Sequence, residues 1–333
     1  MTSSLPLPPD SPDDWDSLDL SRPTDAVPGS SQSYVRITRG CDNFCTYCIV
    51  PCVRGAEVSR HPDRIADEVR RLIDAGRSEI TLLGQTVNSY LWSATGRTVR
   101  FSDLLTLLSP IPGLRRLRFV TSHPVNFGDD VLTAMRDGAN ICRYIHCPAQ
   151  SGSDAVLQRM NRKYTRAQYD DFVDRAYAIL PDVALAGDFI VGFPGETDSD
   201  HAASVDLIRR TRYRNSFVFK YSPRAGTLAA KRYSDDVPEP VKKRRNAELL
   251  AAQSEVGLAH YRAYIGRRVE VLVSGLAPRA DRKSPPPPGQ ALLLGRTRGD
   301  HIVVFNAPES LIGSYADVTI VEATDLTLFG SFP

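Results

Sequence analysis

Residues 39–55, RGCDNFCTYCIVPCVRG, carry three cysteines in a C-x3-C-x2-C spacing directly after a strand-like run at residues 34–38, YVRIT. Thiolates on one tight loop can converge on a single inorganic core. A structural zinc site uses four protein ligands, and no fourth Cys or His with the usual spacing lies near this loop. A four-iron cluster held by Cys41, Cys45 and Cys48 leaves one iron open for a small molecule. The spacing therefore favours an iron–sulfur cluster, with a zinc site or three unconnected thiols as the alternatives.

Outward from this loop, the sequence alternates between strand-like and helix-like segments. The helical pattern is clear at Ile65, Val69, Leu72 and Ile73, which share one helix face and are followed by Gly76. Such an alternation predicts an α/β fold with a parallel sheet, open or curled into a partial barrel. Active sites of these folds lie at the C-terminal ends of the strands, where the cysteine loop stands. The six strand-like runs are residues 34–38, 79–84, 116–121, 144–149, 184–192 and 216–222.

The pattern changes towards the C-terminus. A helix rich in cations is predicted at residues 238–264, and five short strands follow at close spacing, which is typical of a small all-β barrel of about 60 residues. The segment 281–290, DRKSPPPPGQ, is expected to form an exposed, extended loop between two of these strands. The five strand-like runs are residues 267–275, 291–299, 301–306, 315–323 and 326–330.

The expected organisation is a tail and two domains. Residues 1–26 contain six Asp, one Arg and five Pro but few large apolar side chains, which predicts a disordered, linker-like tail. Residues 27–260 form the expected α/β core domain, and residues 262–328 form the expected all-β barrel.

The composition is that of an ordinary globular chain, since 42% of the 333 residues are hydrophobic and 24% are charged. No apolar run approaches the roughly 20 residues that a membrane-spanning helix needs. The first residues have neither a basic start nor an apolar core, so no secretory signal is expected. Six cysteines in such a chain indicate thiols or metal ligands in a reducing compartment. We therefore expect a cytoplasmic protein, neither membrane-spanning nor globally disordered.

The segment around the cysteines, with Tyr47 before the last of them, resembles the signature of the radical S-adenosylmethionine (SAM) enzymes. Further segments are similar to the tRNA methylthiotransferases of the MiaB type. The segments LLGRTRGDHIVVFN (293–306) and LTLFG (326–330) resemble the TRAM domain, a small RNA-binding β-barrel. The resemblance covers about residues 33–330. In the core it rests on EITLLGQTVNSY (79–90), RLRFVTSHP (116–124), QSGSDAVLQRMNRKYT (150–165), DFIVGFPGET (188–197) and FKYSPRAGT (219–227).

The resemblance implies a radical SAM partial (β/α)6 barrel followed by a TRAM barrel. It also implies a transferase with one [4Fe-4S] cluster, bound by Cys41, Cys45 and Cys48, whose open iron binds the amino and carboxylate groups of SAM. An electron from a flavodoxin- or ferredoxin-like donor releases a 5′-deoxyadenosyl radical, which takes hydrogen from C2 of adenine. The expected activity is addition of a methylthio group to isopentenylated adenosine beside the anticodon, with the tRNA anticodon stem-loop as partner.

Other functions stay open at this point. Related methylthiotransferases act on threonylcarbamoyl-adenosine in tRNA or on an aspartate of a ribosomal protein. A different class of protein altogether is an inactive RNA-binding remnant that keeps only the basic surface and the barrel. The iron content separates these classes, because a lone radical cluster brings about four irons per chain and a binding module brings none.

Small and polar residues at successive strand ends are the candidates for binding SAM. Gly84 and Gln85 close the second strand, where the superfamily usually has a small-residue motif near the methionyl amino group. Glycine permits close approach of the backbone to an adenine, although glycine after a strand most often marks only a turn. The remaining candidates are Gln150, Ser151 and Ser153 after the fourth strand and Gly192 and Glu196 after the fifth.

Further residues near these strand ends have less specific interpretations. Arg39 and Arg54 flank the cysteine loop and fit tuning of a cluster as well as a plain surface position. His123 and His146 are expected to be hydrogen-bonded structural residues. The cysteines expected to be small buried hydrophobic residues are Cys52, Cys142 and Cys147.

Positive charge concentrates in residues 209–245, where twelve cations face three acidic residues. A basic stretch of this density predicts a contact surface for RNA phosphates, which is independent of sequence and sensitive to salt. A solvated helix face is the alternative for the run at residues 242–245 taken alone. The predicted RNA-binding residues are Lys220, Arg224, Lys242, Lys243, Arg244, Arg245, Arg296 and Arg298.

In one respect the chain departs from the family pattern. Family members carry a further N-terminal domain, in which three cysteines hold a second four-iron cluster that supplies or activates the sulfur. The 333 residues contain no such second pattern, so radical generation is expected without an obvious sulfur donor. A start site placed too far downstream, a split or degenerate gene and a changed activity are competing explanations. A separate chain that carries this domain is therefore an expected partner.

Overall fold

The computed structural model describes residues 30–94, 96–278 and 286–333, so the predicted tail at 1–26 lies outside the described residues. Six parallel strands pair in the orders β1-β4-β7 and β8-β9-β10, and a parallel bridge between Leu117 and Ile141 joins the two halves. The predicted α/β class and its six strands are confirmed. The strands are β1 (Gln32–Arg36), β4 (Glu79–Leu83), β7 (Arg116–Phe119), β8 (Tyr144–His146), β9 (Ala184–Val191) and β10 (Asn215–Lys220).

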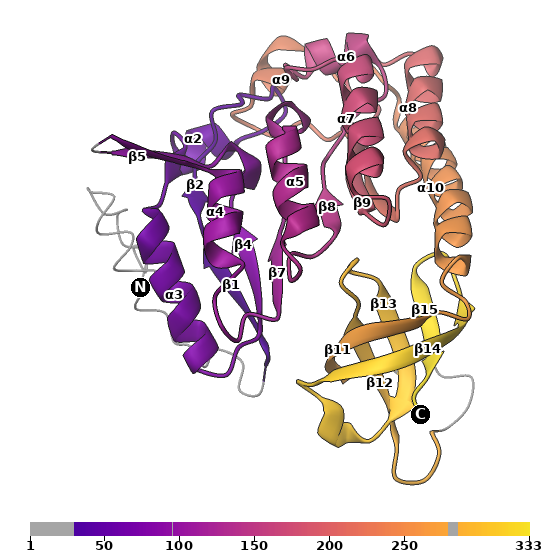
Figure 1. Cartoon of the computed structure of the whole chain (residues 1–333). Helices are drawn as coiled ribbons and strands as arrows, with labels where there is room; N and C mark the ends of the chain where they lie inside the picture. The colour runs from indigo at the N-terminus through magenta and orange to yellow at the C-terminus, as the bar shows by residue number, and fades with distance from the viewer. Residues whose placement is uncertain (1–29, 95, 279–285) are drawn as a thin grey trace, which may run out of the picture.

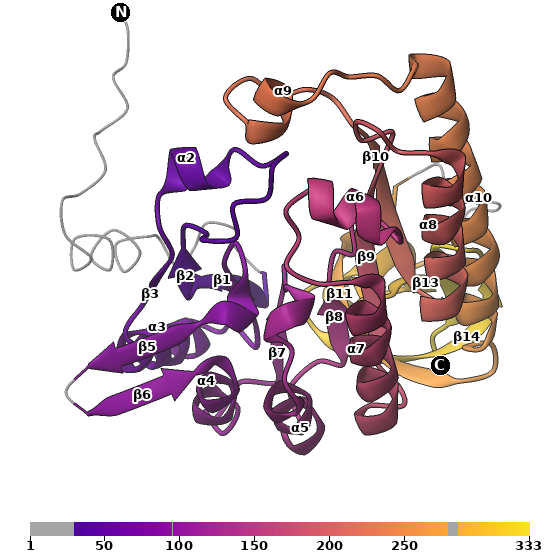
Figure 2. The ribbon, with the colours of Figure 1, turned by 90° about the horizontal axis from the view of Figure 1, so that it is seen from above.

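Helices surround the outer side of this curved sheet, as Figures 1 and 2 show. Pro62 lies in the first turn of α3, and the His61 side chain accepts a hydrogen bond from the Asp63 N–H, so the chain leaves its extended path there. The same helix buries Ile65 and Val69, as its spacing predicts. The longer helices are α3 (Pro62–Asp74), α4 (Phe101–Leu108), α5 (Asp129–Asp137), α6 (Asp154–Arg159), α7 (Arg166–Ile179), α8 (Asp198–Thr211) and α10 (Glu239–Arg262).

Short elements lie mostly around the C-terminal ends of the strands. Two small hairpins form, β2 (Thr38–Arg39) with β3 (Val58–Ser59) and β5 (Leu91–Ala94) with β6 (Arg97–Arg100). The short helices α2 (Val50–Arg54) and α9 (Leu228–Arg232) lie at the top in Figure 1, above the sheet. The sequence did not predict these elements, because segments this short show no periodicity.

The strands have an outer face packed against the helices and an inner face that lines the open barrel. In β9, Phe189 and Val191 belong to the main core, while Asp188 and Ile190, which alternate with them along the strand, are only partly buried. Each large apolar side chain buried in this way contributes about 1.5–3 kcal/mol. Among the described residues, β1 and β10 each pair with one neighbouring strand, so the barrel stays open between these two edges.

Helix α10 leads into a closed five-stranded barrel with its own apolar core. The predicted helix and five strands are confirmed, and of the predicted loop at 281–290 only residues 286–290 are described, without strand structure. No described helix has both the length and the apolar character needed to cross a lipid bilayer. The barrel strands, in the order β11-β12-β13-β15-β14, are β11 (Arg268–Leu276), β12 (Ala291–Arg296), β13 (Ile302–Ala307), β14 (Tyr315–Ala323) and β15 (Thr327–Ser331).

Buried arginines fix the small barrel to the N-terminal ends of the core strands. Arg116, at the start of β7, is fully buried, and its guanidinium lies 2.9 Å from the Glu270 carboxylate of β11 and 3.4 Å from that of Glu79. Arg118 donates to the Thr297 carbonyl oxygen at 2.6 Å. Buried charges persist only where they are paired and hydrogen-bonded. The barrel therefore closes the end of the core opposite to the cysteine loop.

Candidate functional site

The cysteine loop leaves the C-terminal end of β1 and closes on itself at its base. The Cys41 N–H donates to the Gly55 carbonyl oxygen at 3.2 Å. Gly40 has a φ of +76°, and a Cβ there would lie 1.9 Å from the Ala56 carbonyl oxygen. Only glycine tolerates both the left-handed conformation and this close approach. Gly40 therefore sets the position of the loop that holds the three thiols.

Two of the three sulfur atoms receive a hydrogen bond from within the loop. Asn43 Nδ2 lies 3.4 Å from Cys41 Sγ, and the Val50 N–H lies 3.5 Å from Cys48 Sγ. Hydrogen bonds to sulfur stabilise the thiolate and are one of the means by which proteins set the reduction potential of a cluster. These two donors are therefore placed to stabilise Cys41 and Cys48 as thiolate ligands of a cluster.

The third sulfur is contacted by Arg162, which sequence reasoning missed. Arg162 Nη1 lies 3.3 Å from Cys45 Sγ, and Arg162 Nη2 donates to the Pro148 carbonyl oxygen at 3.2 Å. Arg162 Nε donates to the Tyr164 hydroxyl at 3.1 Å. Only the position of Arg162 within the quoted segment 150–165 gave a signal, because its contact with Cys45 depends on tertiary structure. The guanidinium adds a fixed positive charge beside the thiols.

The donor set fits an iron–sulfur cluster better than a single metal ion. Within the described ranges, no three His, Cys, Asp or Glu side chains are arranged to hold one metal ion. A four-iron cube is bound at separate corners, so its ligands need not converge on one point. Burial raises the pKa of the Cys48 thiol, the Val50 N–H opposes this, and Cys45 and Cys41 raise that pKa further. Each of the three sulfur atoms thus has one nitrogen donor of its own.

The end of the second strand, where Gly84 and Gln85 are the predicted SAM contacts, lies beside the cysteine loop. A Cβ at Gly84 would lie 2.1 Å from Thr38 Oγ1, so a glycine is needed for the end of β4 to lie this close to β2. Gln85 is exposed, and the buried Thr86 that follows it has its Oγ1 3.3 Å from Asn43 Nδ2. The strand end and the thiol loop therefore form one continuous surface.

The predicted residues after the fourth strand are held mainly by protein contacts. Gln150 has a φ of +68°, and its N–H donates to the Asp188 carbonyl oxygen at 2.8 Å. Ser151 is buried, with its Oγ 3.4 Å from Ser204 Oγ. The Ser153 side chain caps α6 and also bonds the Asp200 carboxylate. These bonds fix the backbone of the segment, and a role of the three side chains toward SAM remains a prediction.

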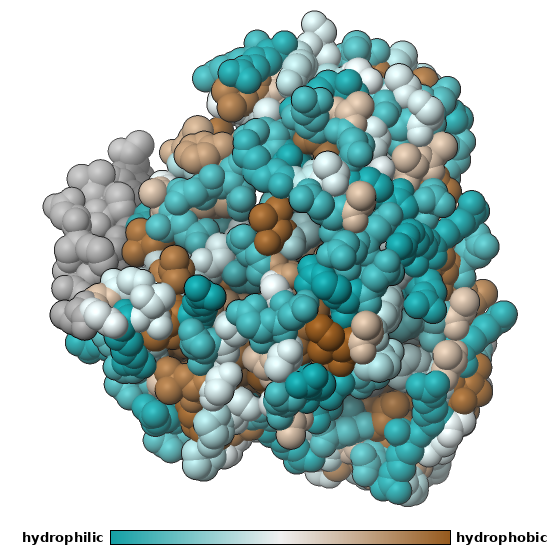
Figure 3. All heavy atoms as spheres, turned by 45° about the horizontal axis from the view of Figure 1, so that its top comes forward, coloured by the Kyte–Doolittle hydropathy of each residue, from teal (hydrophilic) through white to brown (hydrophobic). Residues whose placement is uncertain are grey.

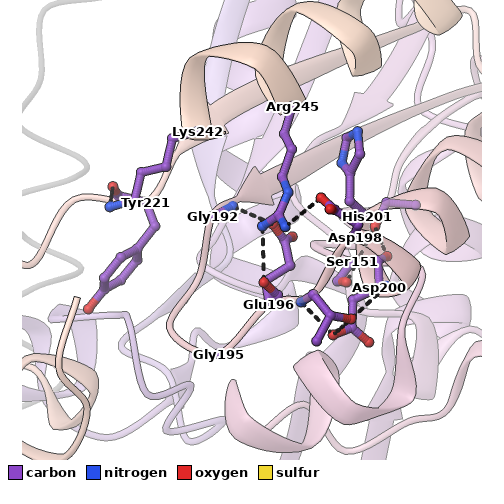
Figure 4. Close-up of polar contacts among 12 residues, drawn as sticks. Ser151, Gly192, Gly195, Glu196, Asp198, Asp200, His201, Tyr221, Lys242 and Arg245 are labelled. Atoms are coloured by element: carbon purple, nitrogen blue, oxygen red, sulfur yellow. Dashed lines mark hydrogen bonds and ion pairs between the residues drawn. The ribbon is translucent and has the colours of Figure 1, made fainter. Parts of the chain in front are cut away.

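After the fifth strand, Gly192 and Glu196 form a loop that is closed by its own hydrogen bonds, shown in Figure 4. Glu196 Oε2 accepts from the Gly192 N–H at 2.7 Å and from Arg245 Nη1 at 2.8 Å. Arg245 also donates to the Asp198 carboxylate at 2.9 Å. Burial raises the pKa of Glu196, while the Gly192 N–H and Arg245 act against that increase. Glu196 therefore links this loop to α10.

The prediction that Lys242 and Arg245 contact RNA is wrong, because both side chains are buried. Lys242 Nζ donates to the Tyr221 carbonyl oxygen at 3.1 Å and to the Asp235 carboxylate at 2.5 Å. Arg245 is bound by Glu196, as described above. Both cations serve to hold α10 against the core, so neither is free to bind a phosphate.

The other predicted RNA-binding residues are accessible to different degrees. Lys220 pairs with Glu239, Arg244 pairs with Asp198 and Glu248, and Arg224 and Lys243 are exposed. Arg296 and Arg298 are half-buried at the junction between the barrel and the core, where Arg298 bonds the Ala139 carbonyl oxygen. Figure 3 shows the upper face as mostly hydrophilic, with apolar residues in small separate patches.

Two of the remaining cysteines and histidines depart from expectation, Cys52 and His123. Among the described residues, His123 Nδ1 is buried without a hydrogen-bond partner. Cys52 is exposed rather than buried, because α2 buries none of its residues, whereas Cys142 and Cys147 are buried as expected. His146 Nε2 lies 2.9 Å from Asp188 Oδ1. Burial, together with the charge of Arg162, lowers the pKa of His123 to about 3.

Two family models match the chain. The model of the radical SAM superfamily matches residues 35–208, and the model of the TRAM domain matches residues 262–332.

Curated relatives are similar over nearly the whole chain. The tRNA-2-methylthio-N(6)-dimethylallyladenosine synthase of Rhodopirellula baltica is 46% identical over 303 residues, which is 91% of this chain and 63% of that protein. The protein of the same name from Desulfitobacterium hafniense is 45% identical, over 92% of this chain and 66% of its own length. The one from Clostridium botulinum (strain Loch Maree) is 43% identical, over 95% of this chain and 67% of its own length. The chain thus spans less than two thirds of the first two relatives.

Among solved structures, coproporphyrinogen III oxidase from Escherichia coli, described as a radical SAM enzyme, has a similar fold. It superposes with a TM-score of 0.51 at 17% sequence identity, covering 89% of this chain and 68% of that chain. At this identity the likeness concerns the fold alone.

Proposed function

Because the chain belongs to the radical SAM superfamily, and within it to the family of the tRNA-2-methylthio-N(6)-dimethylallyladenosine synthases, we propose that it takes part in methylthiolation of tRNA. The proposed reaction adds a methylthio group to C2 of an isopentenylated adenosine next to the anticodon. Methylthiolation of threonylcarbamoyl-adenosine or of a ribosomal protein, and an inactive RNA-binding remnant, are not favoured, because the curated relatives share the first activity in their name.

The observation that carries this proposal is the loop with Cys41, Cys45 and Cys48, in which each sulfur has its own nitrogen donor. The superfamily implies a [4Fe-4S] cluster and SAM, and we propose one cluster on these three thiolates. When bound, the cluster and SAM supply a 5′-deoxyadenosyl radical that removes hydrogen from C2 of the target adenine.

The residues of this chain would position and tune that chemistry. Arg162, which bonds the Cys45 sulfur, stabilises negative charge on the thiolate and favours the reduced state of a centre held there. A Cβ at Gly84 would lie 2.1 Å from Thr38 Oγ1 and one at Gly192 would lie 2.3 Å from Lys242 Cγ, so glycine lets the ends of β4 and β9 pack closely against these side chains. We propose that the backbone of these two strand ends borders the bound SAM. Gln85, Gln150, Ser151 and Ser153 remain proposed SAM contacts at these ends.

The proposed macromolecular partner is tRNA, through its anticodon stem-loop. The TRAM domain and the names of the relatives support this assignment. Exposed cations at the end of β10 and on α10, among them Arg224 and Lys243, offer contacts for phosphates. An electron donor of the flavodoxin or ferredoxin type, a separate chain that brings a second cluster, and a cytoplasmic location complete the proposal.

The direct test uses the full chain, reconstituted anaerobically with iron and sulfide. We expect about four irons per chain and release of 5′-deoxyadenosine from SAM after reduction with dithionite. With isopentenylated tRNA, mass spectrometry of the nucleosides then detects the methylthio product when a sulfur-donating partner is supplied. Protein that stays free of iron would overturn the assignment of the three cysteines. If SAM is cleaved but no modified tRNA forms although the sulfur-donating partner is present, the assignment of tRNA as the substrate is wrong.

A further inference from the structure

Two phenylalanines on the edge strand β10 are half-exposed on the inner face of the open barrel. Phe217 is 51% exposed and Phe219 is 55% exposed. Their register partners on β9 are Asp188 and Ile190, which lie on the inner face, whereas Val218 between them packs against the main core. We call Phe217 and Phe219 the aromatic shelf. Two neighbouring large rings left in water on an unpaired strand edge are unfavourable for the isolated protein.

The aromatic shelf belongs to a strand that is connected to the cysteine loop. After β10 the chain forms α9, where the Ala229 N–H donates to the Thr46 carbonyl oxygen at 2.7 Å. Ile190, beside Phe219 on the same face, packs against a small apolar cluster against which Tyr47 also packs. Thr46 and Tyr47 lie between two of the proposed cluster ligands. The aromatic shelf therefore lies next to the place where the radical chemistry is proposed.

The opposite end of the inner face is closed. Arg118 donates to the Thr297 carbonyl oxygen at 2.6 Å, and a Cβ at Gly299 would lie 3.4 Å from the Ala184 Cβ. A turn of the small barrel thus covers the N-terminal end of the inner face. A ligand that covers the aromatic shelf must arrive from the open edge or from the end with the cysteine loop.

Polar and charged groups border the aromatic shelf. The His146 ring lies 6.3 Å from the Phe217 ring, centre to centre, and His146 Nε2 is 2.9 Å from Asp188 Oδ1. Beyond the end of β10, the chain presents the exposed cations Arg224, Lys231 and Arg232. Flat rings bordered by cations and hydrogen-bonding groups are the usual surface for single-stranded nucleic acid, in which unpaired bases stack on aromatic side chains.

We propose that the aromatic shelf stacks against an unpaired base of the RNA substrate, while Arg224, Lys231 and Arg232 contact the neighbouring phosphates. The inference rests on the proposed function and adds the residues that position the RNA loop beside the cysteines. A docked protein is the rival occupant. It is less favoured because a protein interface of stable size needs a broad apolar centre, and here the two rings are flanked by charge.

The test uses the reconstituted full chain and an RNA hairpin whose unpaired loop carries 2-aminopurine, a base whose fluorescence is quenched on stacking. For the double variant Phe217→Leu/Phe219→Leu, which keeps apolar side chains but removes both rings, we expect at least about tenfold weaker binding and loss of quenching at saturation. Phe219→Trp keeps a ring and should retain both. Tyr34→Leu is the matched control, since Tyr34 is 60% exposed on the other edge strand and should change neither.

The outcomes separate this inference from the function on which it rests. Wild-type protein that fails to bind the hairpin overturns both. Wild-type binding with unchanged affinity and quenching in the double variant overturns the aromatic shelf alone and favours the docked protein. An equal loss in Tyr34→Leu also overturns it, because the effect is then not specific to β10. Melting temperature and iron content show that each variant is folded, and the Phe219→Trp result distinguishes an effect on stacking from an effect on packing.

Discussion

At the scale of single residues, the four cysteines between positions 41 and 52 differ in their surroundings. Cys45 is contacted by the half-buried Arg162, whereas Cys52 is exposed on α2. We expect Cys45→Ala to lose the cluster and to reduce 5′-deoxyadenosine release to background, because one corner of the cube then lacks its ligand. Cys52→Ala is the control and should retain both. Iron analysis and chromatography of the nucleoside check this, and equal activity of the two variants would contradict the ligand assignment.

The run KKRR at residues 242–245 shows what sequence reasoning can and cannot establish. In the sequence the four cations predict one basic surface. In the structure Lys242 and Arg245 are buried, and Lys243 and Arg244 are exposed. The spacing of three residues already places the first and the last on one helix face. That this face points inward depends on Asp235 and Glu196, which come from other segments, so no local pattern reveals it.

At the scale of elements, the strands and long helices could be predicted because their apolar spacing is local. The runs at residues 79–84 and 184–192 became β4 and β9 with nearly the same bounds. The contact of Arg162 with Cys45 joins residues 117 positions apart and could not be predicted from spacing. Candidate residues at strand ends were easier to find, because parallel strands bring their C-terminal ends to one side.

The exposed cations at the end of β10 and on α10 are expected to dominate non-specific RNA affinity. We expect Arg224→Glu/Lys243→Glu to weaken binding of unmodified tRNA, and to lower the slope of log Kd against log salt concentration by about 0.7–0.9 for each phosphate that the protein no longer neutralises. Arg64→Glu, on the exposed side of α3, is the matched control. Affinity measured across a salt series checks this. Equal slopes for the wild type and the double variant would exclude these cations from the RNA interface.

At the scale of the whole molecule, Arg116 holds the two units together. Removing one partner of a buried ion pair costs about 3–5 kcal/mol. Here Glu79 keeps Arg118 and the partly exposed Glu270 keeps Arg115, but the Arg296 and Glu270 carbonyl oxygens lose their donor, so the lower end of this range applies. We therefore expect Arg116→Ala to lower the free energy of unfolding by about that amount. Arg115→Ala is the control, because Arg115 is half-exposed and pairs with the same Glu270, so its loss should cost at most about 1 kcal/mol. Denaturant titration measures both, and similar losses would contradict the role of Arg116.

The same junction contains a histidine pair, the half-buried His260 and the buried His301, whose Nε2 atoms are 2.8 Å apart. One nitrogen must donate and the other accept, so the two rings cannot both be protonated while this bond is made. Burial, together with the charges of Arg214, Arg212 and Arg267, lowers the pKa of His260 to about 4. In the unfolded chain His260 binds a proton below about pH 6.5, whereas in the folded chain it binds one only near pH 4. Stability therefore falls as the pH drops from about 6.5 towards 4.

The expected loss is at most about 1.4 kcal/mol for each pH unit in that window per histidine. We expect His260→Gln to flatten the dependence of the unfolding free energy on pH between about 6.5 and 4. The control His61→Asn, which changes a histidine at the start of α3 and keeps a capping side chain, should leave the slope as in the wild type. Denaturation midpoints at several pH values decide between these outcomes.

The attachment of the TRAM barrel by Arg116 and Arg118 also has a geometric consequence. A domain held by buried ion pairs does not swing, so its separation from the thiol loop at the far end of the core is constant. An RNA that binds at both places must therefore span a fixed distance between them. The nucleotide that reaches the thiol loop would then be set by its distance along the RNA from the contact with the TRAM barrel. Lengthening the stem by one base pair should therefore shift the position that reacts.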